Sequence, residues 1–516
     1  MQTCSSFWQV SERIAPPDGA QLGFLAEFRA MSEAVRQLNP SALWGRFADL
    51  NDIPRPSGQE AAVCEWITGL AREAGLEVES DEVGNVLVRK PATPGMENRK
   101  TVVLQSHVDM VCQKNNDTVF DFDTEGIRMK VDGDWVKAEG TTLGADNGLG
   151  AATMLAVMEA NDVAHPALEL LFTIDEETGM TGALELRKEW LKGDILLNLD
   201  TEDDREIGIG CAGGVDMAFE ADFGTVSGTE DHGVTIEVKG GSGGHSGMDI
   251  HKGIANANKI LVRVLREMMA KNATAELAVL DGGGLRNAIP REAKATVASN
   301  LSAAQWEAEL TELAAAIQAE YKTTDPSLTI QLHDVGAPDH VVPEHHTQAI
   351  LSVLDICPNG IDRMSPDIEG LVQTSNNLAR ILLTDGKMEA HCLTRSSVDS
   401  EKLDFARRIE AGFEMAGFSS SRGGAYPGWT PNPSSDVVRM MTDLYRELYQ
   451  EEPLVLACHA GLECGILGSR YPHLDMVSFG PTILGAHSPD ERASVSSVAK
   501  YWDWFQEALK RIPEHT

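Results

Sequence analysis

Two histidines and several carboxylates in this sequence stand at or just beyond the ends of apolar runs, and these residue types can hold divalent metal ions. His107 and Asp109 follow the apolar run TVVLQ (101–105). Residues two apart in extended backbone project to one side, so Asp109 could orient His107 as carboxylates orient zinc-bound histidines. A lone His-x-Asp pair is more often a surface pair or a cap, so this pattern is weak by itself.

Asp146 lies among glycines in TTLGADNGLGAA, immediately before the apolar helical run 151–160. One interpretation is a helix N-cap in a tight turn, a role that Asp-Asn-Gly sequences often serve. The other is functional. Glycines let the backbone approach a ligand closely, and a carboxylate placed there could bridge two cations.

The adjacent acids Glu176 and Glu177 follow the apolar run LELLFTI (168–174). Neighbouring side chains in extended backbone point in opposite directions, so one could be a metal ligand and the other a general base over a bound water. Because Asp175 precedes them, a solvated acidic turn is the competing interpretation.

Asp200 ends the strand-like run ILLNLD, and His487 lies in SFGPTILGAHSPDE after another predicted strand. The carboxyl-terminal ends of strands are where open α/β sheets bind ligands, so the coincidence of these positions favours one shared site. Two histidines and three carboxylates form a mixed set that suits two zinc ions. His245, within GGSGGHSGMD (240–249), is equally compatible with a loop histidine that has no task.

The elements that must position these residues change in character along the chain. A helix is predicted over 60–75, strands over 76–90, and further strands alternate with helices up to residue 200, which indicates an α/β sheet. After Cys211, amphipathic strands such as VTIEVKG and LTIQLH alternate with long helices such as AAQWEAELTELAAAIQAEY. The sequence therefore predicts one domain from 31–212 and 403–516, an inserted α+β domain at 213–402, and a poorly ordered extension at 1–30.

Composition excludes several functions. The 79 acidic residues exceed the 43 Lys and Arg residues and give a formal net charge of −36, which repels nucleic acids and anionic membrane surfaces. No apolar run is long enough to span a bilayer, and the first thirty residues do not read as a signal peptide. The eight cysteines form no C-x-x-C pair, so free thiols in a reducing cytoplasm are expected.

Several motifs together resemble the M20 family of metallopeptidases, and in particular its bacterial dipeptidases. They are SHVDM, GTTLGADNGLG, DEETGM, NLD, GGHSG, GGLRNAIPREA, HAGLECG and GPTILGAHSPDE. The resemblance runs from about Met31 to the C-terminus and includes stretches without catalytic residues, such as RKPATPGMENRK. It implies a zinc-peptidase-like catalytic domain, a mixed sheet with helices on both faces, carrying an inserted α+β lid domain.

The resemblance also implies a metal centre of two Zn²⁺ ions per subunit, which Co²⁺ or Mn²⁺ can replace. Asp146 would bridge the two ions, with His107 and Asp200 completing one coordination set and Glu177 and His487 the other. Glu176 would be the general base, and Asp109 would orient His107. No role is implied for Cys458, His459 and Glu463 beyond a structural one.

In the lid domain, the resemblance implies that His245 stabilises the oxyanion and that Asn287 and Arg395 bind the substrate's terminal carboxylate. The expected activity is hydrolysis of unblocked dipeptides, including Xaa-His and carnosine-like substrates. The alternative is an amidohydrolase of the same family that acts on N-acyl amino acids. The resemblance makes a homodimer the expected assembly. The expected binding partner is the dipeptide substrate, and neither nucleic acid nor a membrane is expected to bind.

Overall fold

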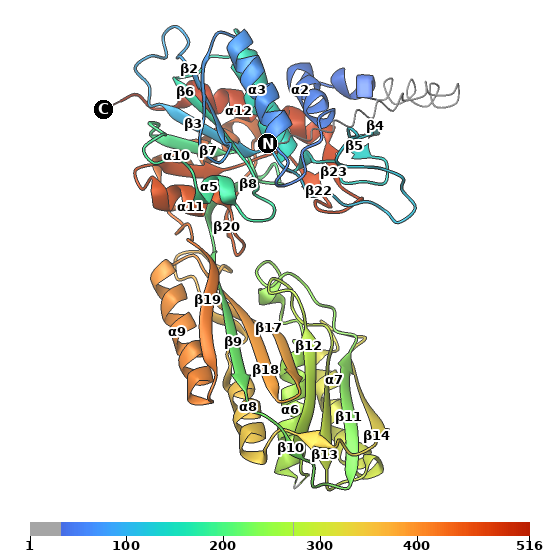
Figure 1. The fold of residues 1–516 in the computed structure, drawn as a ribbon. Helices are drawn as coiled ribbons and strands as arrows, with labels where there is room; N and C mark the ends of the chain where they lie inside the picture. Colours follow the sequence, from blue (N-terminus) through green and yellow to red (C-terminus); the bar gives the residue numbers. More distant parts are fainter. Residues whose placement is uncertain (1–31, 272, 516) are drawn as a thin grey trace, which may run out of the picture. The chain divides into compact units, whose positions relative to one another are not determined.

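The computed structural model describes residues 32–271 and 273–515. They form two compact units (Figure 1). Unit 1 holds the described residues of Met1–Arg187, Leu197–Asp204 and Phe479–Thr516, and unit 2 holds those of Lys188–Leu196 and Arg205–Ser478. The predicted extension at 1–30 and Cys4 lie outside the described residues. The other seven cysteines are free thiols, as expected from their spacing.

Unit 1 is built from short strands and helices that come from both ends of the described chain. Its elements are α2 (Ser41–Asn51), α3 (Ala61–Glu73), β1 (Glu77–Ser80), β2 (Val86–Lys90), β3 (Val102–His107), β4 (Met129–Asp132), β5 (Trp135–Ala138), α4 (Ala145–Glu159), β6 (Leu168–Thr173), α5 (Thr181–Leu184), β22 (Ile483–Leu484), β23 (Arg492–Ser494) and α12 (Val495–Arg511). Strand β7 (Ile195–Asn198) is divided between the two units.

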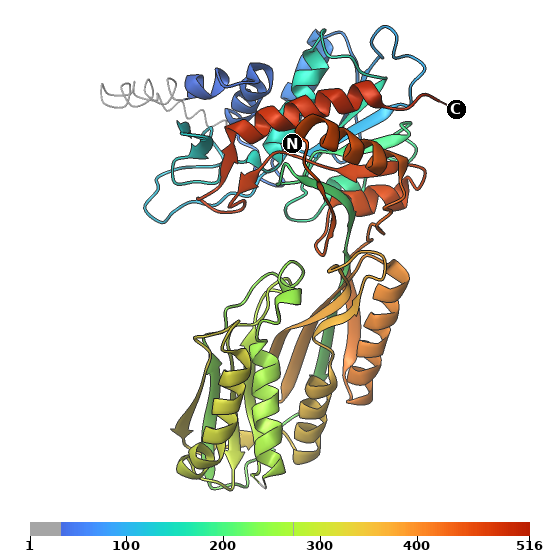
Figure 2. The same ribbon diagram turned by 180° about the vertical axis from the view of Figure 1, so that it is seen from behind.

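The main strands of unit 1 run in the order β1-β2-β6-β3-β7. Strand β3 pairs with β6 in parallel, whereas β2 pairs with β6 and β1 in antiparallel fashion, so the sheet is mixed as predicted. Every residue of β3 and β6 is buried, which explains their continuous apolar runs. Helix α3 lies in front of these strands in Figure 1, and α12 lies in front of them when seen from behind in Figure 2.

A second, four-stranded sheet of unit 1 has the order β22-β23-β5-β4. Its strand β23 leads directly into α12, whose N-cap Ser494 accepts a hydrogen bond from the backbone N–H of Ser497. Helix α4 is apolar all round, and nearly all of its residues are buried, as expected for a central helix. It packs against α2 and β3.

Unit 2 contains the remaining elements. They are β8 (Glu206–Cys211), β9 (Gly213–Asp222), β10 (Val226–Ser227), β11 (His232–Lys239), η1 (Ile250–Lys252), α6 (Ala257–Ala270), β12 (Glu276–Gly283), β13 (Ala293–Ser299), α7 (Ala303–Tyr321), β14 (Thr329–Val335), β15 (His340–Val341), α8 (Glu344–Ile356), β16 (Gly360–Met364), β17 (Val372–Thr384), β18 (Lys387–Ser396), α9 (Asp399–Met415), β19 (Ser419–Tyr426), α10 (Asp436–Tyr449), β20 (Leu454–Cys458), α11 (Glu463–Arg470) and β21 (Asp475–Ser478).

The largest sheet of unit 2 has the order β14-β11-β13-β12-β17-β18-β9-β19, with β16 added against β17. Its strands pair antiparallel, and Figure 2 shows α6, α7 and α9 in front of it. One apolar core fills the space between sheet and helices, where the rings of Phe219 and Phe413 stack 3.9 Å apart. Strands β21, β8 and β20 are hydrogen-bonded neighbours in that order.

Several predicted elements match the structure closely. The run AAQWEAELTELAAAIQAEY is helix α7, which begins with a capping box between Ser302 and Gln305. The predicted domain limits at 212 and 402 differ from those of the compact units, because α9 to α11 and β19 to β21 cluster with unit 2. The compact units do not define domain limits, so the predicted limits at 212 and 402 stay a prediction. No helix within residues 32–271 and 273–515 has the length and apolar character that crossing a membrane requires.

Candidate metal centre

His107 is the last residue of β3, and its imidazole is 1% exposed. All six residues of the strand are buried, and His107 stands at its carboxyl-terminal end. Immediately beyond it, the buried carboxylate of Asp109 places Oδ1 3.2 Å from Nδ1 of His107. The opposite ring nitrogen, Nε2, thus faces the remaining carboxylates.

Asp109 also positions the loop that carries the two adjacent acids. Its Oδ1 accepts the backbone N–H of Glu176 at 3.1 Å, and its Oδ2 accepts that of Glu177 at 3.2 Å and the hydroxyl of Ser57 at 2.8 Å. Burial opposes ionisation of this carboxyl, but His107 and these donors lower the pKa of Asp109 to about 2. Asp109 is therefore ionised and serves two segments at once.

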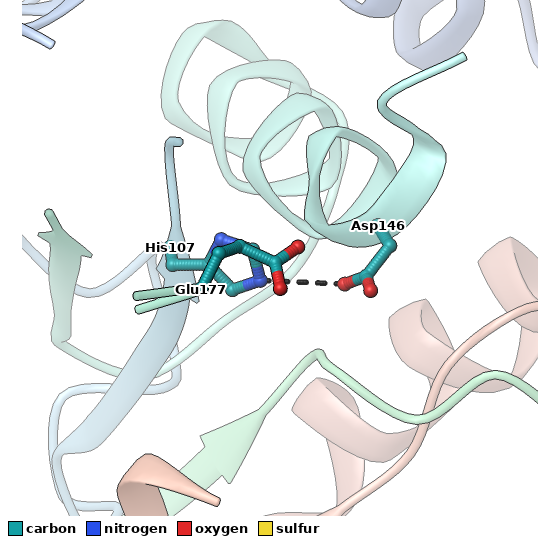
Figure 3. A group of neighbouring side chains, drawn as sticks. All are labelled: His107, Asp146 and Glu177. Carbon is teal, nitrogen blue, oxygen red and sulfur yellow. Dashed lines mark hydrogen bonds and ion pairs between the residues drawn. The ribbon is translucent and has the colours of Figure 1, made fainter. Parts of the chain in front are cut away.

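Asp146 lies at the start of α4, where the backbone is not yet helical (φ −82°, ψ 112°). Its two carboxylate oxygens face different imidazoles. Oδ1 lies 3.3 Å from Nε2 of His107, and Oδ2 lies 3.1 Å from Nε2 of His487 (Figure 3 shows the former contact). This is the placement that a carboxylate bridging two cations needs.

Two further carboxylates complete the cluster around Asp146. Asp200, just beyond β7, places Oδ1 3.4 Å from Nε2 of His107, and Glu177 places Oε2 3.1 Å from Nε2 of His487. One ligand atom each of His107, Asp146 and Glu177 lies within 4.8 Å of the others. The five predicted ligands therefore form two sets that share Asp146.

The electrostatics of the cluster indicate a site for cations. Burial raises the pKa of Glu177 and of Asp200, because their charges are removed from water beside that of Asp146. Hydrogen bonds to Asp146 and Glu177 raise the pKa of His487 to about 11, despite the opposing effect of burial. Within the described part of the chain, the buried Oε1 of Glu177 has no hydrogen-bond partner, as expected of an oxygen awaiting a metal ion.

Glu176 differs from its neighbour in its surroundings. Asp109 holds the backbone N–H of both residues, but Glu176 is half-buried, whereas the side chain of Glu177 is 5% exposed and faces His487. Adjacent acids on one loop thus occupy different environments, and the expectation that only one of them is a ligand stays a prediction.

The predicted lid residues meet one another within unit 2. Arg395, at the end of β18, is 4% exposed and donates to the hydroxyl of Tyr426 at 2.8 Å and to that of Ser246 at 3.4 Å. The backbone N–H of Ser246 donates to the carbonyl of Asn287 at 2.7 Å, and Asn287 itself is exposed. Backbone pairing also joins His245 to Ala288.

The loop around His245 determines which ring nitrogen carries the proton. Nδ1 accepts the backbone N–H of Gly247 at 3.2 Å and that of Met248 at 3.0 Å. A nitrogen that accepts must be unprotonated, so Nε2 bears the hydrogen and is a donor. The backbone N–H of His245 is itself held by Asp249 at 2.7 Å.

Sequence reasoning gave His459 no role beyond a structural one and missed other residues that build these sites. His459 follows β20, is buried, and lies with Nε2 2.7 Å from the hydroxyl of Ser375. Burial, and then the charge of Arg395, lowers the pKa of His459 to about 3, so this imidazole is neutral. Glu491 and Arg55 were also missed. A motif quotes Glu491, yet nothing in the sequence marks it as buried.

The sequence and fold of this chain are similar to those of known peptidases. The family model for peptidase family M20/M25/M40 matches residues 103–511. The cytosol non-specific dipeptidase of Escherichia coli strain K12 is 45% identical over 94% of this chain and 100% of its own length. The crystal structure of aminoacylhistidine dipeptidase from Vibrio alginolyticus is 42% identical, with a TM-score of 0.85 over 93% of this chain and 99% of that one.

A more distant structure, aminopeptidase PepT from Bacillus cereus, shares the fold at 16% identity, with a TM-score of 0.54 over 92% of this chain and 99% of that one. The family model and the close relatives both span the segments that carry the cluster, from His107 on β3 to His487 before β23. On this evidence the chain belongs to peptidase family M20/M25/M40.

Proposed function

We propose that this chain is a metal-dependent dipeptidase that hydrolyses the peptide bond of unblocked dipeptides, Xaa-His among them. The observation that carries the proposal is the cluster of two imidazoles and three carboxylates around Asp146 in unit 1. The similar E. coli and V. alginolyticus proteins are both named as dipeptidases, and both are matched over almost their full length.

The donor set fits two zinc ions. Imidazole nitrogen and carboxylate oxygen together suit this borderline-soft metal, and neutralisation by cations would relieve the repulsion among Asp146, Glu177 and Asp200. His107 and Asp200 would hold one ion, Glu177 and His487 the other, and Asp146 would bridge them. Co²⁺ or Mn²⁺ could replace zinc, because both accept the same ligands.

When bound, such ions lower the pKa of a water molecule towards neutrality and polarise the scissile carbonyl. Glu176 would accept the proton of that water and later deliver it to the leaving amine. His245, whose Nε2 is fixed as a donor, would hydrogen-bond to the developing oxyanion. A preorganised donor of this kind contributes about 3 kcal/mol of transition-state stabilisation.

Arg395 has the surroundings of a carboxylate receptor. It is a buried guanidinium whose side-chain hydrogen bonds go to two neutral hydroxyls, those of Tyr426 and Ser246. A buried cation beside neutral partners favours an anionic ligand, and a guanidinium binds a carboxylate through two parallel hydrogen bonds. We propose that Arg395 binds the free C-terminus of the substrate, with Asn287 assisting from its neighbouring loop.

The competing activity within the family is hydrolysis of N-acyl amino acids, which would use the same ligands and base. Purified protein, loaded with zinc and assayed on a free dipeptide and on the N-acetyl derivative of its C-terminal amino acid, separates the two. We expect turnover of the dipeptide, β-alanyl-histidine included in the panel, and little of the N-acetyl compound. Faster cleavage of the N-acetyl compound would assign the alternative.

The cellular setting and the assembly follow from resemblance. We propose a cytoplasmic location, since the E. coli relative is named as cytosolic, and a homodimer, which relatives make the expected state. Size-exclusion chromatography with light scattering tests the second point. A monomeric mass over a wide range of protein concentration would contradict it.

A further inference from the structure

The carboxylate of Glu491 accepts hydrogen bonds from four consecutive backbone N–H groups. Its Oε2 lies 2.6 Å from the nitrogen of Leu143 and 3.0 Å from that of Gly144. Its Oε1 lies 2.7 Å from the nitrogen of Ala145 and 3.3 Å from that of Asp146. Glu491 is 3% exposed, so these four N–H groups replace water as the hydrogen-bond donors to its carboxylate.

These N–H groups belong to the turn that places Asp146. Helix starts leave N–H groups without intrahelical partners, and α4 has no capping side chain of its own at Gly144. Gly144 adopts a left-handed conformation (φ 70°), and Asp146 is extended (φ −82°, ψ 112°). Without Glu491, several backbone N–H groups of this buried turn would have no acceptor. The free-energy cost of these unpaired donors would favour a different backbone conformation of the turn.

Arg55 holds the same turn from the other side. One guanidinium nitrogen donates to the carbonyl of Gly144 at 2.7 Å, and another donates to those of Val108 and Asp109 at 2.9 and 3.1 Å. Arg55 is 1% exposed. It therefore ties the turn that carries Asp146 to the segment just beyond His107.

Glu491 also connects Asp146 with the other imidazole. It lies on the same loop as His487, and its own N–H donates to the carbonyl of Ser488 at 3.0 Å, which closes the loop on itself. Since His487 Nε2 lies 3.1 Å from Oδ2 of Asp146, one loop supplies an imidazole to Asp146 and a cap to its backbone.

We propose that Glu491 is a positioning residue, which together with Arg55 fixes Asp146 between His107 and His487 and thereby sets the geometry of the metal centre. The inference rests on the proposed function, because it concerns the same metal ligands. Glu491 does not touch the proposed ions or the substrate. It acts through the backbone of residues 143–146 and requires a carboxylate, whose two oxygens accept from two N–H groups each.

The test is Glu491→Gln, which keeps the size of the side chain. An amide nitrogen would face two backbone N–H groups as a donor, so two of the four hydrogen bonds are lost. Glu169→Gln is the matched control, because Glu169 is equally buried (3% exposed) in unit 1 and pairs with Arg89 on the sheet. The readouts are the zinc dissociation constants from competition with a chelator, the visible spectrum of the Co²⁺-loaded protein, and kcat and KM.

For Glu491→Gln we expect zinc to bind about 10- to 100-fold more weakly, the usual effect of losing a residue that orients metal ligands. The Co²⁺ spectrum should change, and kcat should fall with little change in KM. Glu169→Gln should match the parent in all of these. Parental zinc affinity and an unchanged Co²⁺ spectrum in Glu491→Gln, even with a lower unfolding temperature, would reduce Glu491 to a structural cap and overturn the inference.

If Glu491→Gln does not fold, Glu491→Asp carries the test, because it keeps the charge and retracts it by one methylene group. Weaker zinc binding than in the parent supports the inference, and parental binding overturns it. A parent chain that binds neither zinc nor Co²⁺ would refute the proposed function and the inference together. Zinc binding by the parent with no difference in either variant refutes the inference alone.

Discussion

Oδ1 of Asp109 lies 3.2 Å from Nδ1 of His107 and at the same time accepts a backbone N–H from the loop of Glu176. An ionised carboxylate at this distance favours the proton on Nδ1, which would leave the lone pair of Nε2 for a metal ion. The same contact couples the orientation of a proposed ligand to the position of the proposed base. Under the proposed function, metal binding and proton transfer would both depend on Asp109.

The adjacent acids Glu176 and Glu177 should separate by phenotype. In Glu176→Gln we expect zinc content near that of the parent and a loss of at least about 100-fold in kcat, because a general base typically contributes 10²- to 10⁴-fold. In Glu177→Gln we expect lower zinc content, since a ligand is removed. Atomic absorption and steady-state kinetics on the same preparations provide the measurement. Zinc loss in Glu176→Gln would place it among the ligands.

Substitution of either proposed imidazole ligand should weaken metal binding. His107→Ala and His487→Ala should each bind less zinc than the parent, and the increase in unfolding temperature that zinc produces should shrink accordingly. His165→Ala is the control, because His165 is fully buried in unit 1 and its Nδ1 lies 2.7 Å from the carbonyl of Pro166. Retention of two zinc ions in both ligand variants would refute the cluster as the metal site.

Arg395→Ala should discriminate between substrates with and without a free C-terminus. A hydrogen bond to a charged group contributes about 1.5–3 kcal/mol. Its loss predicts a fall of about 10- to 100-fold in kcat/KM for dipeptides, mainly through a higher KM. A C-terminally amidated analogue lacks the carboxylate and should be affected little. Arg422→Ala, on β19, which removes an ion pair with Glu410 of α9, is the control. Equal losses on both substrates would indicate a structural role.

His459 should make the folded chain sensitive to acid. Its pKa is lowered to about 3 by burial and by Arg395, so between about pH 6.5 and pH 3 the unfolded chain binds a proton that the folded chain does not. The contribution of the neutral His459 to the free energy of unfolding is complete above about pH 6.5. It falls as the pH decreases, by about 2 kcal/mol at pH 5.

Thermal unfolding of metal-free protein at about pH 7 and pH 5 measures this effect. His459→Gln, which can still bond to Ser375, should lose less stability on acidification than the parent, and substitution of the exposed His340 should not alter the loss. An identical pH dependence in the parent and in His459→Gln would show that His459 is not the responsible group.

Much of the fold could be predicted because the patterns involved are local. The apolar run before His107 is strand β3, and the helix predicted over 60–75 is α3 at Ala61–Glu73. The limits of the compact units could not be read in this way. They depend on which strands and helices contact one another across long stretches of chain, and hydrophobic periodicity carries no information about that.

The same division holds for the candidate site. His107, Glu177, Asp200 and His487 were proposed as ligands from residue type and position after predicted strands, and Asp146 from its place among glycines before a helix. The structure brings all five together. Glu491 and Arg55 were missed, because a buried charge that bonds to main-chain groups looks like any surface charge in a sequence. Ser375 and Tyr426 were missed because a hydroxyl becomes informative only beside its partner.

Asp109 and Glu491 hold the loops of this centre through main-chain N–H groups, and this has a consequence for which changes the loops tolerate. Such contacts depend on the path of the backbone and are indifferent to the side chains that the N–H groups belong to. A point substitution that preserves the path leaves them intact. A single-residue insertion or deletion between Leu143 and Asp146 shifts the register of the donors, so chain length is constrained here as well as the residue type at Gly144, whose φ of 70° disfavours a side chain.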